Sequence, residues 1–323
     1  MQVDLPLEQL RTFQYEVDDP EDFDAFWAST LETYGAGPLH VRRVEVDTGL
    51  RSVECTDLTF AGYGGSDVRA WVIRPADRAG PAPVVVEYLG YGGGRSHPIE
   101  FLPYASAGFV HLVMDTRGQG SVTRPGDTED RYGSGPAAPG FLTKGLPNRD
   151  AYYYRRLFVD AYRAVDVAKT LPGVDQARVV VTGRSQGGAM SLVAAGLRTD
   201  VALAVPHVPL LCAFRRALRI TDREPFAELG RWLGTHRLSV DEALDTLRYF
   251  DGVAFARRAS CLGSFSVALN DLVAPPSSVF AAHNAYGGPT EITVWPFNGH
   301  EAGGPEDVLR TIRAVRALED RGD

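Results

Sequence analysis

The chain has 323 residues, of which 44% are apolar, and a formal net charge of −8. This length and composition predict one main domain over residues 1–323, and the lack of a broad basic field argues against a nucleic-acid partner. No window approaches about twenty apolar residues, so no membrane span is predicted. Cys55, Cys212 and Cys261 have no disulfide or zinc spacing, and the N-terminus has no signal-peptide pattern. We therefore expect a cytoplasmic protein.

The first part of the chain predicts a helical arm over residues 1–40. Asp19-Pro20 resembles a helix cap followed by proline at the first helical position, and apolar residues follow at helical spacing. Beyond the arm, the segments DLTFAGYGGSD, VRAWVIRP and APVVVEYLG have the apolar patterns of strands. The glycines and aspartate of GYGGSD indicate a hairpin between the first two strands.

After Val84 the chain alternates between strand and helix patterns. The strand patterns are FVHLVMD, RVVVTG, LAVPHVP, CLGSFSVAL and EITVWPF, and the helix patterns cover about 150–170, 187–197, 240–249, 276–286 and 305–318. This alternation predicts an α/β fold in which a mostly parallel, doubly wound sheet is covered by helices on both faces. Residues 124–147 predict a long loop. The mostly helical segment 211–249 is a candidate cap beside the site.

The segment RVVVTGRSQGGAMSLVAAG suggests a nucleophile. Gly183-Arg184-Ser185-Gln186-Gly187 matches G-x-S-x-G, in which the serine lies on a strained strand-to-helix turn that small neighbours permit. A serine nucleophile needs a base to take its proton, and the base needs an orienting carboxylate. In the fold that this motif indicates, the partners follow in the order Ser, Asp or Glu, His.

Four histidines follow Ser185, and their local sequences distinguish them. His300 lies in VWPFNGHEAGG, a loop just past the last predicted strand, where α/β sheets carry their sites, so we predict that it is the base. His283 falls on a predicted helix with apolar neighbours. His207 comes too early for the chain order, and His236 lies among polar residues of the candidate cap. We expect these three to be structural.

Two carboxylates compete for the third position. Asp271 directly follows the predicted strand CLGSFSVAL, and the ends of two neighbouring strands can bring it to His300. Glu301 is adjacent to His300 and would have to fold back. We therefore predict Asp271 as the orienting acid and expect Glu301 to brace the loop.

An acyl-transfer site also needs hydrogen-bond donors for the oxyanion. The backbone N–H of Gln186, the residue after the nucleophile, is one of them. The loop GYGGG after an earlier strand supplies the second, which we assign to the N–H of Tyr91, with Gly92 as the neighbour that could replace it. The alternative is a glycine loop that serves only as a turn.

The segment MDTRGQGSV, which contains Arg117, Gly118 and Gln119, follows another predicted strand. Arg117 and Gln119 could reach the site, but we expect scaffolding, with Arg117 paired to a buried carboxylate that holds the loops. The sequence has no H-E-x-x-H and no clustered His and Cys, and no phosphate-loop or ribose-binding pattern accompanies the glycines. No metal and no cofactor are therefore predicted.

With these residues identified, the sequence resembles the acetyl xylan esterase and cephalosporin-C deacetylase family, carbohydrate esterase family 7. The resemblance covers nearly the whole chain, from DLPLEQL to NGHEAGG. Its specific part is a triple signature of RGQ, GxSQG and HE, which this chain carries at residues 117–119, 183–187 and 300–301.

The resemblance implies an α/β-hydrolase fold, a Ser185-His300-Asp271 triad, and an oxyanion hole formed by the amides of Tyr91 and Gln186. It also implies the removal of acetyl and other short acyl groups from small acetylated sugars, such as xylo-oligosaccharides, and from cephalosporin C, without a cofactor. Relatives commonly assemble as hexameric rings with the sites facing an inner chamber. A homo-oligomer, a hexamer by resemblance, is therefore expected.

Two departures from the family pattern and two alternative functions stand beside this hypothesis. Ala274 stands where relatives often have cysteine, and residues 99–106 lack the tryptophans of relatives, which leaves the preferred alcohol portion open. A prolyl-oligopeptidase-like serine peptidase shares the elbow and the triad order, but such enzymes usually use an additional domain to select peptides. An inactive hydrolase-like binding module would lack a catalytic residue, and none is missing here.

Overall fold

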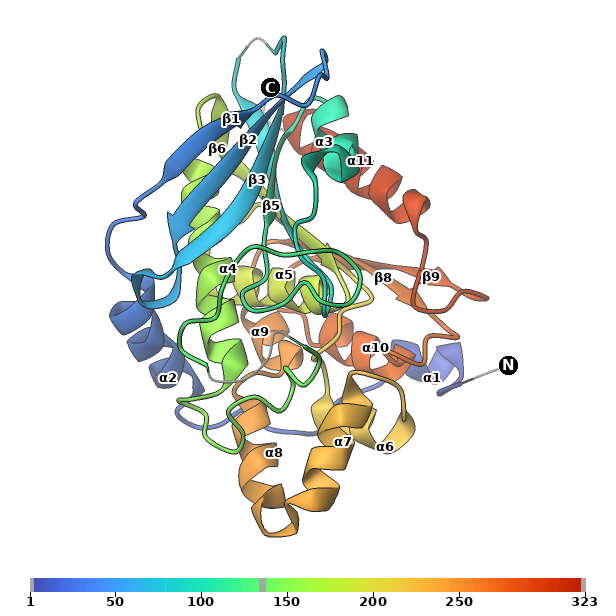
Figure 1. Ribbon diagram of the computed structural model, residues 1–323. Coiled ribbons are helices and arrows are strands. Elements are labelled where there is room, and N and C mark those ends of the chain that lie inside the picture. Colours follow the sequence, from blue (N-terminus) through green and yellow to red (C-terminus); the bar gives the residue numbers. More distant parts are fainter. Residues whose placement is uncertain (1–2, 79, 134–137, 321–323) are drawn as a thin grey trace.

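The computed structural model describes residues 3–78, 80–133 and 138–320. Their strands form one nine-stranded sheet in the order β1-β2-β3-β5-β4-β6-β7-β8-β9 (Figure 1). The strands are β1 (Arg42–Val46), β2 (Val53–Ala61), β3 (Asp67–Pro75), β4 (Ala82–Tyr88), β5 (Val110–Met114), β6 (Val174–Arg184), β7 (Leu203–His207), β8 (Leu262–Ala268) and β9 (Thr290–Trp295). All neighbours from β5 to β9 are parallel, whereas β1, β2 and β3 run antiparallel to their neighbours. The predicted α/β-hydrolase architecture, a parallel sheet entered through an antiparallel hairpin, is confirmed.

Helices lie on both faces of this sheet and beyond one end of it. They are α1 (Leu7–Arg11), α2 (Phe23–Thr30), α3 (Leu102–Ser106), α4 (Tyr153–Lys169), α5 (Gln186–Leu197), α6 (Phe214–Ile220), α7 (Phe226–Thr235), α8 (Val240–Arg248), α9 (Gly252–Arg258), α10 (Pro276–Asn284) and α11 (Pro305–Asp320), with short turns η1 (Leu31–Gly35), η2 (Tyr63–Gly65), η3 (Pro98–Phe101) and η4 (Arg237–Ser239). Figure 1 shows α3 and α11 on one side of the sheet and α4, α5 and α9 on the other.

The central strands are apolar throughout because both of their faces are buried. In β4, Val84 and Val86 belong to the large core cluster that includes α4, α5 and α9, whereas Val85 belongs to the cluster that includes Val315 of α11. Successive residues of a strand point to opposite faces, so a continuous run of valines serves both cores. Each buried side chain of this size contributes about 1.5–3 kcal/mol relative to an exposed one.

The N-terminal arm differs in detail from the prediction. Its main helix, α2, begins at Phe23 rather than at Pro20. Asp19 does not cap it, because its carboxylate pairs with Arg257 at 2.5 Å and with Arg258 at 2.6 Å. The tertiary ion pairs therefore outweigh the local capping signal that the sequence suggested.

The structure also describes the predicted cap segment 211–249 and most of the predicted loop 124–147. The helical segment 211–249 contains α6, α7 and α8, which Figure 1 shows together beyond one end of the sheet. The described part of the expected loop 124–147 has neither helix nor strand. The predictions also covered residues outside the description, namely 1–2 of the arm, 134–137 of the loop, and 79 and 321–323 of the domain.

Two further findings concern the burial of the three free thiols and the ability of the helices to cross a membrane. Cys55 and Cys212 are buried in apolar clusters. Cys261 is partly buried, and its Sγ is hydrogen-bonded to the Tyr286 hydroxyl at 3.2 Å. Within the described ranges, every helix is either too short or too polar to cross a membrane.

The junction of β6 and α5 generates a stability prediction. A Cβ on Gly187 would clash with the Tyr88 carbonyl of β4, whereas a Cβ on exposed Gly230 of α7 would meet nothing within 4 Å. Gly187→Ala should therefore lower the free energy of unfolding by about 1–3 kcal/mol or more through overpacking. Gly230→Ala should raise it by about 0.5–1 kcal/mol, because it stiffens the unfolded chain and favours the helix. Urea unfolding of both variants checks this, and equal effects at the two positions would contradict the packing argument.

Candidate active site

Ser185 lies between β6 and α5 with a backbone of φ 58° and ψ −120°. This conformation costs a non-glycine residue about 1–3 kcal/mol and persists only where the surroundings hold it. Here the Ser185 N–H donates to the His207 carbonyl of β7 at 2.9 Å, and the Leu210 N–H donates to the Ser185 carbonyl at 3.0 Å. The predicted elbow is therefore present, held by the neighbouring strand.

Asp271 and His300 lie together although 29 positions separate them in the chain. The Asp271 Oδ2 is 2.8 Å from the His300 Nδ1. The other carboxylate oxygen accepts the N–H groups of Val273 at 2.8 Å and Ala274 at 3.0 Å. Asp271 is fully buried, whereas the His300 side chain is 30% exposed, so the ring has access to solvent while its partner does not.

The ends of β8 and β9 bring this pair together. Beyond the last ladder pair, Leu269 N–H donates to the Trp295 carbonyl and Asn270 N–H to the Asn298 carbonyl, both at 3.0 Å. These bonds extend the pairing of the two strands into the segments that carry Asp271 and His300. The site therefore stands at the carboxyl edge of the parallel sheet, as the strand-end argument predicted.

Glu301 braces the loop that carries His300. Its carboxylate accepts the Gly299 N–H and the Asn298 side-chain amide, both at 3.1 Å. Its own backbone N–H and that of Gly299 lower the pKa of this exposed carboxyl, with a smaller contribution from the positive charge of Arg184. Arg184 ends β6, which runs parallel to β8 and β9, so the elbow that follows it also lies at the carboxyl edge of the sheet.

A buried polar group that the sequence analysis missed supports the same loop. Asp307, in the first turn of α11, accepts the Gly303 N–H at 2.9 Å and the Trp295 indole N–H at 3.0 Å. The Ser266 hydroxyl of β8 donates to the Asp307 carboxylate at 3.1 Å. The same hydroxyl is also hydrogen-bonded to the His207 ring. An acidic residue in the first turn of a helix usually indicates only a favourable helix start, so no sequence signal distinguishes this one.

The glycine-rich loop after β4 is joined to the elbow by side chains. The Gln119 Oε1 accepts the Gly92 N–H at 2.6 Å, and the Gln119 Nε2 donates to the Gln186 Oε1 at 3.0 Å. Gln186 also donates to the Leu89 carbonyl at 3.3 Å. The Gly92 N–H is thus occupied, while among the described residues the N–H groups of Tyr91 and Gln186 have no acceptor.

Arg117 lies beneath these loops and is fully buried. Its guanidinium makes two hydrogen bonds to the Asp160 carboxylate of α4, at 2.5 and 2.8 Å, and one to the Ser66 hydroxyl at 3.0 Å. Its carbonyl accepts the Tyr153 hydroxyl at 2.6 Å, while the next residue, Gly118, has a φ of 66° and continues the turn. Arg117 therefore has the buried carboxylate partner that the sequence analysis expected.

The predicted residues thus form two hydrogen-bonded groups. His300 and Asp271 form one, and the loops of Tyr91, Gln119 and Gln186 form the other, with Ser185 directly before Gln186 in the chain. Among the hydrogen bonds of the described residues, none joins the Ser185 hydroxyl to His300. Within those residues there is also no group of three or more His, Cys, Asp or Glu side chains arranged to hold a metal ion.

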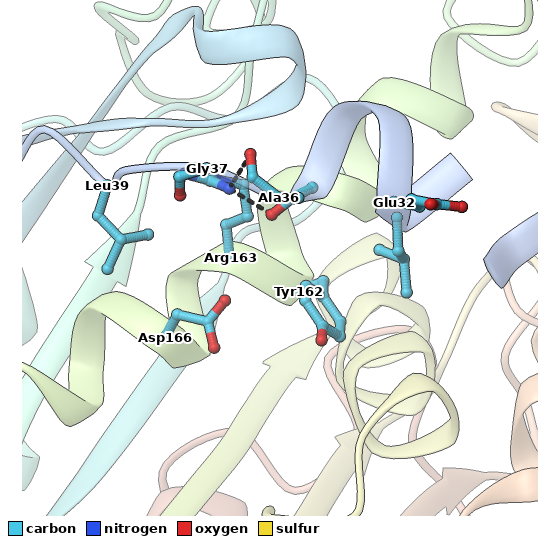
Figure 2. A pocket seen from close by; sticks show the side chains of 9 residues that line it. Glu32, Ala36, Gly37, Leu39, Tyr162, Arg163 and Asp166 are labelled. Carbon is cyan, nitrogen blue, oxygen red and sulfur yellow. Dashed lines mark hydrogen bonds between the residues drawn. The ribbon is translucent and has the colours of Figure 1, made fainter. Parts of the chain in front are cut away.

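A surface hollow lies in a different part of the molecule. Figure 2 shows it between η1 and α4, where Glu32, Tyr162 and Asp166 are among its nine lining residues. Arg163 projects into it, and its guanidinium donates to the carbonyls of Ala36 and Gly37 (Figure 2). None of the predicted site residues lines this hollow, so it has no part in the candidate site.

Comparisons with known proteins show the family of this chain. The model of the family described as acetyl xylan esterase (AXE1) matches residues 1–313. The acetyl esterase Axe7A of Xylanibacter ruminicola is 32% identical over 293 residues, which are 87% of this chain. This chain spans 64% of the length of that relative.

Solved structures show the same similarity. An acetyl xylan esterase from Paenibacillus sp. R4 has a TM-score of 0.90 and 35% identity, over 97% of this chain and 99% of that one. Acetyl xylan esterase 1 from Thermoanaerobacterium sp. JW/SL YS485 has a TM-score of 0.87 and 30% identity, over 96% and 98% of the two chains. An acylaminoacyl peptidase of Pyrococcus horikoshii, at 17% identity, a TM-score of 0.60 and coverage of 84% and 42%, shares the fold alone. The chain belongs to the acetyl xylan esterase (AXE1) family, a family of carboxylic ester hydrolases.

Proposed function

We propose that this protein is a serine esterase that removes acetyl groups from small acetylated carbohydrates, such as xylo-oligosaccharides, and from cephalosporin C. The observation that carries the proposal is the Asp271–His300 pair, 2.8 Å apart, at the sheet edge where the strained Ser185 elbow stands. Family membership supports the acyl specificity.

In the proposed reaction, Ser185 Oγ attacks the acetyl carbonyl carbon while His300 Nε2 takes the hydroxyl proton. Asp271 accepts the hydrogen bond from His300 Nδ1–H, which keeps the proton on Nδ1 and leaves Nε2 free to act as the base. The imidazolium then protonates the leaving sugar oxygen as the C–O bond breaks. Water attacks the acetyl-enzyme in the same way, so acetate leaves and Ser185 regains its proton.

The negative charge that develops on the carbonyl oxygen needs donors, and we propose the N–H groups of Tyr91 and Gln186. The occupied N–H of Gly92 supports Tyr91 over that neighbour. A donor of this kind is worth about 3–4 kcal/mol of transition-state stabilisation. The scheme uses no cofactor and no metal.

Ser185→Ala tests the nucleophile. Hydrolysis of 4-nitrophenyl acetate should fall by about six orders of magnitude in kcat, because the covalent intermediate cannot form. The far-ultraviolet circular dichroism spectrum should remain that of the wild type. Retained esterase activity in a folded Ser185→Ala variant would overturn the assignment.

Asp271→Asn tests the orienting acid. The new amide nitrogen would donate to His300 Nδ1 and move the ring proton to Nε2, so kcat should fall by about four orders of magnitude. Glu301→Gln is the matched control, since an amide oxygen keeps the loop hydrogen bonds, and its loss should stay below about ten-fold. A larger loss in Glu301→Gln than in Asp271→Asn would exchange the roles of the two carboxylates.

The substrate class is tested by comparing acyl and alcohol portions. We expect kcat/KM to be highest for acetyl esters and to fall by about ten-fold or more for butyryl and longer esters. Acetylated xylo-oligosaccharides and cephalosporin C should both release acetate. Hydrolysis of proline-containing peptides without hydrolysis of acetyl esters would favour the peptidase alternative.

We also propose, from the family resemblance, a hexameric assembly.

A further inference from the structure

Glu228 of α7 is a buried carboxylate that the proposed reaction does not use. It is 8% exposed, and its Oε1 accepts the Tyr91 hydroxyl at 2.6 Å and the Leu142 N–H at 2.9 Å. Burial raises the pKa of this carboxyl, while the Tyr91 hydrogen bond acts in the opposite direction. A buried carboxylate destabilises a fold unless hydrogen-bond partners compensate for its burial. The two specific partners of Glu228 therefore indicate that this acid has a role of its own.

The direction of each hydrogen bond at the Tyr91 oxygen follows from its neighbours. The N–H groups of Gly140 and Phe141 both donate to this oxygen at 3.0 Å. Since both of these partners are donors, the phenolic proton must go to Glu228. Burial also raises the pKa of Tyr91, so the phenol keeps its proton. The phenol is thus anchored by three polar partners, with Glu228 as the acceptor.

This anchor acts on the residue that carries a proposed oxyanion donor. The main chain next to Tyr91 is held from one side by the Gln119 bond to the Gly92 N–H. The side chain is held from the other side by Glu228, and its ring packs edge-on against Phe141 with 5.5 Å between centroids. The Tyr91 N–H is on the same Cα as the anchored side chain and one residue before the anchored Gly92 N–H, so both attachments restrict where it points.

We propose that Glu228 is a positioning residue that sets the orientation of the Tyr91 N–H in the oxyanion hole and couples the α6–α8 segment to catalysis. The inference rests on the proposed esterase function. Placement errors of about 1 Å in such a site can cost about 100-fold in rate, so the loss of one anchor is measurable.

The test uses the full-length protein with Glu228→Ala, Glu228→Gln, Tyr91→Phe and the double variant Glu228→Ala/Tyr91→Phe. Glu228→Ala should lower kcat on 4-nitrophenyl acetate about 10- to 100-fold with KM changed by less than about three-fold, because the donor acts on the transition state. Glu228→Gln keeps an acceptor oxygen and should stay within about five-fold of the wild type. Exposed Glu242 of α8 provides the matched control, and Glu242→Ala should leave kcat unchanged.

Two further measurements separate positioning from general destabilisation. The losses in Glu228→Ala and Tyr91→Phe should not multiply in the double variant, because both remove the same contact. Inhibition by phenylboronic acid, whose tetrahedral adduct with a serine places an oxygen where the oxyanion forms, should weaken in parallel with kcat/KM. A merely structural role would lower the melting temperature without this parallel.

The outcomes distinguish this inference from the proposed function. An inactive wild type, or an active Ser185→Ala variant, overturns both. If the wild type is active through Ser185, a kcat of Glu228→Ala within about two-fold of the wild type overturns the positioning role alone, as do fully multiplicative losses in the double variant. Should Glu228→Ala fail to fold, an unchanged kcat in Tyr91→Phe decides against the role.

Discussion

The left-handed backbone at Ser185 constrains everything around the end of β6. The chain can adopt it only because Gly183 and Gly187 have no side chains where the Tyr88 carbonyl of β4 approaches. That approach places the end of β4 against the start of α5, so the loop after β4 must leave the sheet beside the serine. The backbone conformation of Ser185 therefore determines which backbone N–H groups can lie around this serine. The backbone of the serine is held in this conformation by hydrogen bonds to the His207 carbonyl and the Leu210 N–H, and by the Ala189 N–H of its own helix.

The loops around this elbow are held by polar side chains from other elements rather than by their own structure. Gln119 connects the glycine-rich loop to Gln186, Asp307 supports the loop of His300, and Glu228 anchors the side chain of Tyr91. Buried polar groups are stabilising only when their partners are present, so each of these contacts also restricts the alternatives open to a loop. A site whose reacting groups lie on loops gains in this way the rigidity that catalysis requires.

The parts of the fold that the sequence predicted well are those in which local pattern and burial agree. The parallel strands are apolar runs because two cores need them, and α4, α5, α8, α10 and α11 follow helical patterns closely. The exposed edge strand β1, the short helices α1, α3 and α9, and the true start of α2 were not predicted. The edge strand β1 buries little apolar surface, and α1, α3 and α9 have only five to seven residues each, which are too few to display a clear helical pattern. The Asp19-Pro20 signal was wrong because two distant arginines compete for the same carboxylate.

The sequence by itself determined the fold class and the chemical groups of the candidate site, because G-x-S-x-G, the chain order and the strand ends are local features. It also indicated that Arg117 needs a buried acid, but not that Asp160 supplies it. Only the tertiary structure decided that the Gly92 N–H is occupied and that the Tyr91 hydroxyl meets Glu228, 137 positions away. Such contacts depend on how far separated segments pack, since a hydrogen bond tolerates errors of only a few tenths of an ångström. No periodicity or motif along the chain carries information at that precision.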